Sequence, residues 1–309
     1  MTFLSPDFHR LYLQAGQRMA MGDHHGAILL LKQALALDPE HAAAHALLAL
    51  NLLVGNRVHA ATVEAQRAVE LDPEASLAHR ALGLAEFYRR RWAPAEEHLM
   101  RAISLDPIDA GNLCSLAEIY VAQGRRAEAR ATLEKARNLE PNDPDVLADL
   151  GELDLAEGNL ADAEARSREA LEQSPDHAAA LVVLGHVHLR KKDSESAKDH
   201  AAWVLRDYPN HRGALHLLAA IKAHQSPVIG VWWRWNTWMQ TLPDARSMLV
   251  LLGGFALYRT VTILAEDAAY VPIVEYGWLA IVAYTWIGPM IFKRMLTKEL
   301  ATIRLRPDF

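Results

Sequence analysis

Cysteine is almost absent from this chain of 309 residues, because Cys114 is its only one. A single cysteine excludes a disulfide within the chain and fits a reducing compartment. Aromatic residues make up only 7% of the sequence. A glycine-rich phosphate loop, a G-x-S-x-G elbow and a zincin motif are also missing, and each of these motifs serves a known chemistry. We therefore predict no catalytic residues and no cofactor, and we interpret the protein as a non-enzyme.

Positive charge is scarce in the first two thirds of the chain. Residues up to His224 hold 24 basic and 32 acidic side chains, whereas the remainder holds 8 and 6, for a formal net charge of −6. A nucleic-acid partner would require a basic stripe, so we predict no nucleic acid. Residues 1–7 have no basic run and no apolar core, and we expect no signal peptide.

Six prolines recur at one interval of 34 residues: Pro39, Pro73, Pro107, Pro141, Pro175 and Pro209. Such a fixed period indicates a repeat architecture. Proline does not continue a helix from its interior, and an aspartate before it can cap the helix that follows. We expect each proline to mark the place where one helix ends and the next begins.

Small residues recur at fixed places when each repeat is counted so that its proline is residue thirty-two and the first repeat begins at Phe8. The eighth residue is always alanine or glycine, the twentieth is always alanine, and the twenty-seventh is alanine in five repeats and Val204 in the sixth. Small side chains at such positions let two helices cross closely. The sequence therefore predicts paired helices in an all-α fold.

This pattern resembles the tetratricopeptide repeat (TPR), a helix-turn-helix unit that stacks into an α-solenoid. The resemblance implies six repeats and a terminal capping helix within a 1–224 solenoid domain. Their predicted ranges are 8–41, 42–75, 76–109, 110–143, 144–177 and 178–211 for the repeats and 212–224 for the capping helix.

Fifteen histidines raise the question of a metal site. The strongest candidate joins His41 and His45, four residues apart, with His24 and His25. No acid or cysteine completes this set to the three or four ligands that zinc requires, so we predict no metal. His45 and His79 stand at the fourth position of their repeats, where the TPR family often has an aromatic residue, and we interpret them as packing residues.

The composition changes after Pro227. Four tryptophans lie within seven residues, Trp232, Trp233, Trp235 and Trp238, and two apolar stretches follow at 247–265 and 271–292. Each stretch is close to the ~20 residues that span a bilayer as a helix. We predict a Trp-rich interfacial helix and linker over 225–246, two transmembrane helices and a basic cytoplasmic tail over 293–309. A buried soluble hairpin, or tryptophans that dock on a membrane partner, are the alternatives.

The charges flanking the predicted spans set their orientation. The loop at 266–270 is acidic and the tail is basic, so the positive-inside rule places both chain ends in the cytoplasm. We expect a two-span protein of a bacterial-type inner membrane. Arg259 and Glu275 would lie at similar depths and form an ion pair, unless each snorkels outward independently.

The resemblance also implies a concave groove, built by the first helices, that binds a protein or peptide. By register, its residues are Ala46, Leu50, Leu53, Arg80, Leu84, Phe87, Glu118, Asp149, Glu152 and His186. An apolar early part and an acidic later part would suit a segment with basic residues. The alternative for Leu50 and Leu84 is that they only pack neighbouring helices.

We accordingly expect a membrane-anchored scaffold or adaptor, with work as an assembly factor as one form of that role. The lipid bilayer and membrane proteins are its further expected partners. The alternative function is a permanent structural subunit of a membrane protein complex.

Overall fold

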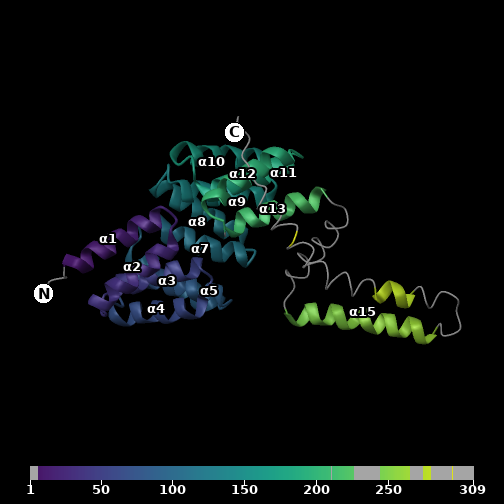
Figure 1. Ribbon diagram of the computed structural model, residues 1–309, viewed down its shortest axis with the longest axis horizontal. Helices are drawn as coiled ribbons and strands as arrows, with labels where there is room; N and C mark the ends of the chain where they lie inside the picture. The colour runs from purple at the N-terminus through teal and green to yellow at the C-terminus, as the bar shows by residue number, and fades with distance from the viewer. Residues whose placement is uncertain (1–5, 210, 226–243, 265–273, 280–293, 295–309) are drawn as a thin grey trace. The chain divides into compact units, whose positions relative to one another are not determined.

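The computed structural model describes residues 6–209, 211–225, 244–264, 274–279 and 294 (Figure 1). The helices with defined bounds are α1 (Pro6–Ala20), α2 (His24–Leu37), α3 (Ala42–Val54), α4 (Val58–Leu71), α5 (Ser76–Tyr88), α6 (Trp92–Leu105), α7 (Ala110–Ala122), α8 (Arg126–Leu139), α9 (Pro144–Glu157), α10 (Leu160–Gln173), α11 (Ala178–Arg190), α12 (Ser194–Asp207), α13 (Arg212–Gln225) and α15 (Asp244–Leu264). The described part is therefore all-α.

The chain divides into two compact units, an N-terminal unit of Met1–Leu184 and a C-terminal unit of Gly185–Phe309. In the N-terminal unit, α1 packs on α2, α3 on α4, α5 on α6, α7 on α8 and α9 on α10. Each pair also contacts the next pair along the chain. In the C-terminal unit, α12 packs on α13. The N-terminal unit is thus the stack of helix pairs that the 34-residue period predicts.

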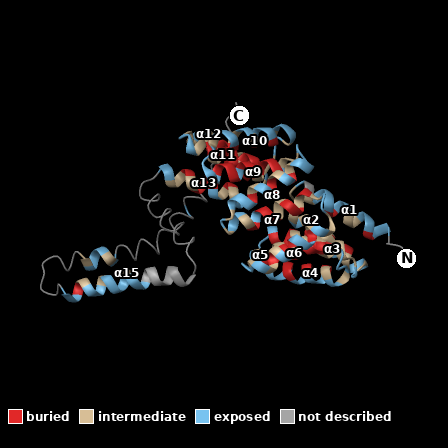
Figure 2. Ribbon diagram, turned by 180° about the vertical axis from the view of Figure 1, so that it is seen from behind, coloured by how far each residue is buried: buried red, intermediate tan, exposed pale blue. Residues whose placement is uncertain are grey.

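The small residues of the repeat lie where the paired helices meet. Every alanine at the twentieth position is fully buried: Ala27, Ala61, Ala95, Ala129, Ala163 and Ala197. Figure 2 shows the buried residues along the helix faces that turn toward neighbouring helices. At the eighth position of the third repeat, a Cβ on Gly83 would lie 2.8 Å from Leu99 Cγ and 3.1 Å from the Ala95 carbonyl oxygen. The predicted close crossing is confirmed there.

The loops between repeats correct one detail of capping. Asp38, Asp72 and Asp106, the acids before the prolines, stand at the C-caps of α2, α4 and α6. The N-cap of the following helix lies three residues further on, as at His41 before α3 and Asp109 before α7. The aspartate therefore ends one helix and does not start the next one.

The turn within each repeat requires a left-handed residue at its fifteenth position. Positive φ angles occur there in all six copies: Gly22, Asn56, Arg90, Gly124, Gly158 and Lys192. Glycine and asparagine adopt this conformation readily, whereas a long side chain on a left-handed residue is unfavourable. Arg90, with φ 60°, is therefore an unfavourable residue for its turn.

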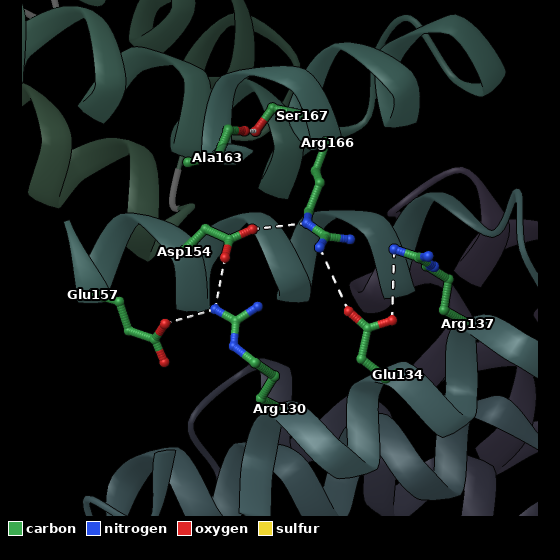
Figure 3. A network of polar contacts seen from close by, with 8 residues as sticks. All are labelled: Arg130, Glu134, Arg137, Asp154, Glu157, Ala163, Arg166 and Ser167. Atoms are coloured by element: carbon green, nitrogen blue, oxygen red, sulfur yellow. Dashed lines mark hydrogen bonds and ion pairs between the residues drawn. The ribbon is translucent and has the colours of Figure 1, made fainter. Parts of the chain in front are cut away.

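A buried carboxylate joins three consecutive helices of the N-terminal unit (Figure 3). Asp154 on α9 has a side chain only 2% exposed, and it accepts from Arg130 of α8 at 2.6 Å and from Arg166 of α10 at 2.7 Å. Arg130 also pairs with Glu157 at 2.7 Å, and Arg166 lies 3.5 Å from Glu134. These contacts fasten one repeat to the next.

Asp154 is the eleventh residue of its repeat, and the residues at this position in two other repeats form ion pairs across their own turns. Glu86, also buried, accepts from Arg91 at 3.1 Å across its own turn. Arg18 and Asp23 bridge the first turn at 2.8 Å with the signs exchanged. Asp154 reaches other helices instead, since residue 159 of its turn is an asparagine.

The membrane prediction does not gain support from the described residues. None of the helices described in the structure is long and apolar enough to cross a bilayer. Helix α15 covers most of the predicted first span at 247–265, and only residues 274–279 of the second span at 271–292 are described. Within the C-terminal unit, Trp278 stacks on Tyr258 with ring centroids 5.1 Å apart.

The close crossing at Gly83 gives a first prediction. Replacing Gly83→Ala should lower the free energy of unfolding by roughly 1–3 kcal/mol, because the added methyl meets a fully buried leucine in a packed core. Urea unfolding followed by circular dichroism measures the change. Gly16→Ala is the matched control: a Cβ there has no atom within 4 Å, so helix propensity should raise stability by up to about 1 kcal/mol. Equal effects of both variants would refute the packing argument.

The Asp154 bridge gives a second prediction. Asp154→Asn should lower the free energy of unfolding by about 2 kcal/mol, since two arginines lose a buried charged acceptor. The exposed carboxylate of Asp7, which pairs with Arg10 at 2.9 Å, is the control. Asp7→Asn should change stability by less than about 0.5 kcal/mol. The bridge would be unimportant if the two replacements had the same effect in urea unfolding.

Candidate functional site

The candidate site lies on the first helices of the repeats in the N-terminal unit. We use the name first-helix face for the solvent-reaching side chains that α3, α5, α7 and α9 place at the predicted register positions: Leu50, Leu84, Phe87, Glu118, Asp149 and Glu152. Leu50, Leu84, Phe87 and Asp149 are half-buried, while Glu118 and Glu152 are exposed.

Two of the predicted groove residues belong to the core instead. Ala46 is 0% exposed and Leu53 is 4% exposed, and both lie in the apolar cluster that α1 to α5 share. The repeat position alone could not exclude them, because the rotation of the first helix about its axis decides which of these positions face the core. They are corrected to core residues.

The early part of the first-helix face is apolar and aromatic. Leu50 and Leu84 pack against the core cluster and still reach solvent, so their packing role is confirmed and their binding role stays a prediction. Phe87 meets Tyr88 and Trp92 edge to face, with ring centroids 5.4 and 5.5 Å apart. Register placed Tyr88 at the edge of the groove, whereas Trp92 was not predicted as a site residue.

Arg80 has a structural partner. Its guanidinium donates to Asp109 Oδ1 and Oδ2 at 3.3 and 3.1 Å. This ion pair is half-buried and ties α5 to the loop before α7. Arg80 is therefore engaged within the repeat stack.

Three carboxyl groups crowd together on α7 and α9. Burial, followed by the charge of Glu152, raises the pKa of Glu118 to about 7. Burial and the charges of Glu152, Asp145 and Glu118 raise the pKa of Asp149 to about 8. Burial also raises the pKa of Glu152. Burial, with repulsion as the second cause for Glu118 and Asp149, thus favours the protonated forms of these groups.

These carboxyl groups have no paired cation in the part of the chain that the structure describes. Glu118 and Glu152 both reach solvent. Among the described residues, no lysine, arginine or histidine forms an ion pair with Glu118, Asp149 or Glu152. Nearby Asp145 differs, because His177 Nε2 lies 2.9 Å from it and lowers its pKa.

Cys114 adjoins the acidic cluster and was missed as a site residue. Its thiol donates to Asp149, and burial together with that carboxylate raises the pKa of the thiol well above its usual range. A thiol held protonated is a poor nucleophile. Cys114 stands at the fifth position of its repeat, as Arg80 does, so the register could have placed it here.

Three of the four histidines weighed as metal ligands contact other groups. His24 Nδ1 lies 2.9 Å from Asn51 Oδ1, and His41 Nδ1 accepts from the backbone N–H of Ala44. His45 contacts Glu64 through Nδ1 and the Pro39 carbonyl oxygen through Nε2. Among the described residues no three histidine, cysteine or acidic side chains converge as metal ligands would.

The remaining predicted residues belong to the C-terminal unit or lie outside the described residues. His186 is half-buried beside His216, with ring centroids 6.0 Å apart, and burial lowers its pKa to about 4. Arg259 and Glu275 are both exposed, and their predicted pairing is not among the ion pairs of the described residues. Trp232, Trp233, Trp235 and Trp238 are not described.

Solved structures similar to this chain share its helix pairs. A thermophilic TPR protein of Thermus thermophilus is 25% identical, with a TM-score of 0.54 over 59% of this chain and 99% of that one. PilW, a type IV pilus biogenesis factor, is 17% identical, with a TM-score of 0.50 over 69% and 99%. A chain of the APC/C Cut9-Hcn1 hetero-tetramer is 16% identical, with a TM-score of 0.52 over 70% and 49%. The last two show the fold alone.

Curated proteins give no match to this sequence. The tetratricopeptide repeat family matches it three times, at residues 18–85, 87–152 and 154–221. These matches span most of the chain and coincide with the paired helices and the 34-residue period. The chain belongs to the tetratricopeptide repeat family.

Proposed function

We propose that this protein binds a polypeptide segment with basic and apolar side chains on its first-helix face, and that it acts as an adaptor without catalysis. The broader role is that of a TPR protein-interaction scaffold, since TPR proteins bind peptide or protein partners in their groove. Leu50, Leu84 and Phe87 would meet apolar side chains of the partner. Glu118, Asp149 and Glu152 would meet its lysine or arginine side chains.

The unpaired carboxyl groups of Glu118, Asp149 and Glu152 are the observation that most favours this function. A cation placed among them offsets their repulsion and lowers their pKa values, so binding is coupled to loss of their protons. Bound arginine also satisfies two carboxylate oxygens at once through its planar fork.

Keeping these groups together lowers the stability of the free protein. The pKa of Asp149 is raised on folding, so the unfolded state loses its proton first as pH rises. The resulting penalty is absent below the unfolded pKa near 4, grows with pH and reaches its full size above about 8. A residue that destabilises the fold is retained more readily when it serves binding.

Binding and stability should therefore change in opposite directions in Asp149→Asn. The substitution should weaken binding of an amphipathic arginine-containing peptide by about tenfold, since one charge-assisted contact is lost. It should also raise the free energy of unfolding at pH 8 by on the order of 1 kcal/mol, with no gain near pH 4. Calorimetric titration and urea unfolding measure the two effects.

The pH dependence of binding provides the control. In the unaltered protein the affinity for the arginine peptide should rise from about pH 6 to about pH 9, because the carboxyl groups must ionise to bind it. The peptide with glutamine in place of arginine should show no such rise. Asp7→Asn, on α1, should leave both affinity and slope unchanged. Binding that is independent of pH would rule out this site.

As a finer proposal, the C-terminal region holds the scaffold at the inner face of a bacterial-type membrane, with both chain ends in the cytoplasm. The tryptophan cluster, the apolar stretches at 247–265 and 271–292 and the basic tail favour it. In the C-terminal unit, α15 leaves Phe255, Leu257 and Leu264 at least half exposed, and lipid would cover such side chains. An assembly factor or a permanent subunit of a membrane complex both fit this location.

Extraction of native membranes tests the location. The full chain should resist washing with alkaline carbonate and dissolve only in detergent, because apolar helices do not leave lipid for water. Release by carbonate would exclude the anchor. Purification in mild detergent then separates the two roles: stoichiometric membrane proteins indicate a permanent subunit, and substoichiometric clients indicate an adaptor.

A further inference from the structure

In repeats two to four, the two ends of the helix pairs differ in charge. We use the name turn edge for the turns within repeats two to four, residues 55–57, 89–91 and 123–125, together with Arg126. The loop edge consists of the loops between repeats, residues 38–41, 72–75, 106–109 and 140–143. The turn edge holds six arginines and no acid, whereas the loop edge holds eight carboxylates and no lysine or arginine.

Several turn-edge arginines have partners within the unit. Arg89 and Arg91 both donate to the buried carboxylate of Glu86, at 2.9 and 3.1 Å. Arg125 pairs with Glu96 at 2.9 Å and with Glu128 at 2.6 Å. These three arginines stabilise the turns.

Arg57, Arg90 and Arg126 are different. All three are exposed, and none forms an ion pair with any described residue. They stand at the sixteenth, fifteenth and seventeenth positions of three successive repeats, so each of repeats two to four places one free cation in or next to its turn. Stacking of the repeats places them along one edge.

Apolar side chains accompany these cations on the turn edge. Val54 is 58% exposed, and Tyr88 and Val121 are each 39% exposed. Each precedes the turn of its own repeat. An edge that alternates arginine with valine and tyrosine matches the headgroup layer of a bilayer, where cations meet phosphates and apolar groups enter the acyl boundary.

The backbone at Arg90 adds a separate observation. Arg90 occupies the left-handed position that glycine fills in three other repeats. An arginine in this conformation is strained, and backbone strain retained at a surface suggests a use for the side chain. Turn formation alone would favour glycine.

We propose that the turn edge of the N-terminal unit docks on an anionic phospholipid surface through Arg57, Arg90 and Arg126. Helices of 13 or 14 residues separate the two edges by about 20 Å at 1.5 Å per residue. The Debye length in physiological salt is about 8 Å, so the membrane attracts the turn edge while the carboxylates of the loop edge are screened. The net negative charge of the protein does not oppose docking in this orientation.

A nucleic acid or an acidic protein segment fits this edge less well. Nucleic acid requires a continuous basic stripe, whereas one free cation per repeat is spaced by intervening apolar side chains. The docking needs no insertion of the C-terminal region, so it stands or falls independently of the proposed anchor. It would orient the repeat stack with the loop edge away from lipid.

A site-specific fluorophore in the full chain tests the docking. Cys114→Ser removes the native thiol, and Val54→Cys carries an environment-sensitive label on the turn edge, with Glu40→Cys as the matched label on the loop edge. We expect vesicles of phosphatidylglycerol mixed with phosphatidylcholine to shift the emission of the Val54 label only. Salt should reverse the shift, and phosphatidylcholine alone should not produce it.

Neutralising the three arginines tests whether they are the residues that bind the vesicles. Arg57→Gln, Arg90→Gln and Arg126→Gln together should weaken the response of the Val54 label by at least about tenfold, since each cation near an anionic surface contributes about fivefold. Sedimentation of the same variant with phosphatidylcholine vesicles measures membrane binding by the C-terminal region separately. Equal shifts of both labels, an unchanged response in the triple variant, or a shift with polyglutamate or DNA but not with vesicles would overturn the proposal.

Arg90→Gly separates binding from folding. The variant relieves the left-handed strain, so its thermal midpoint should stay the same or rise. Its vesicle response should nevertheless fall by about fivefold. A lower midpoint together with an unchanged response would show that Arg90 serves only the turn.

Discussion

The fold depends on how closely the two helices of each repeat approach one another. The twentieth position is a fully buried alanine in every repeat, and at Gly83 an added methyl group would lie 2.8 Å from Leu99 Cγ. Close packing of this kind gains its stability from many small contacts that all require the same interaxial distance. The constraint repeats every 34 residues, so the whole stack follows from one local rule.

Because the crossing uses small residues, the repeat retains much freedom in its polar positions. The eleventh position shows this freedom. Glu86 bridges its own turn, whereas Asp154 links α8, α9 and α10 through Arg130 and Arg166. Both are buried carboxylates that arginine must satisfy. The same repeat thus accepts different ion pairs at one position.

The sequence predicted the helix pairs and their close crossings, because these depend on residue size at fixed spacing. It predicted the candidate site less well. Leu50 and Leu84 reach solvent as expected, but Ala46 and Leu53 are core residues, since helix rotation decides which neighbouring position turns inward. Cys114 stood in the correct register and was passed over. The Asp154 bridge could not be read from the period, because its arginines lie on two other helices.

Charge in the N-terminal unit is organised separately from packing. The acidic cluster at Glu118, Asp149 and Glu152 lies on the first-helix face, and free arginines such as Arg90 lie at the turn edge. Neither set stabilises the fold: the carboxyl groups repel one another, and Arg90 occupies a strained backbone position. Positions that oppose folding in a well-packed repeat are best explained by contacts outside the chain. The proposed polypeptide site and the proposed lipid-docking edge thus use different side chains of the same N-terminal unit.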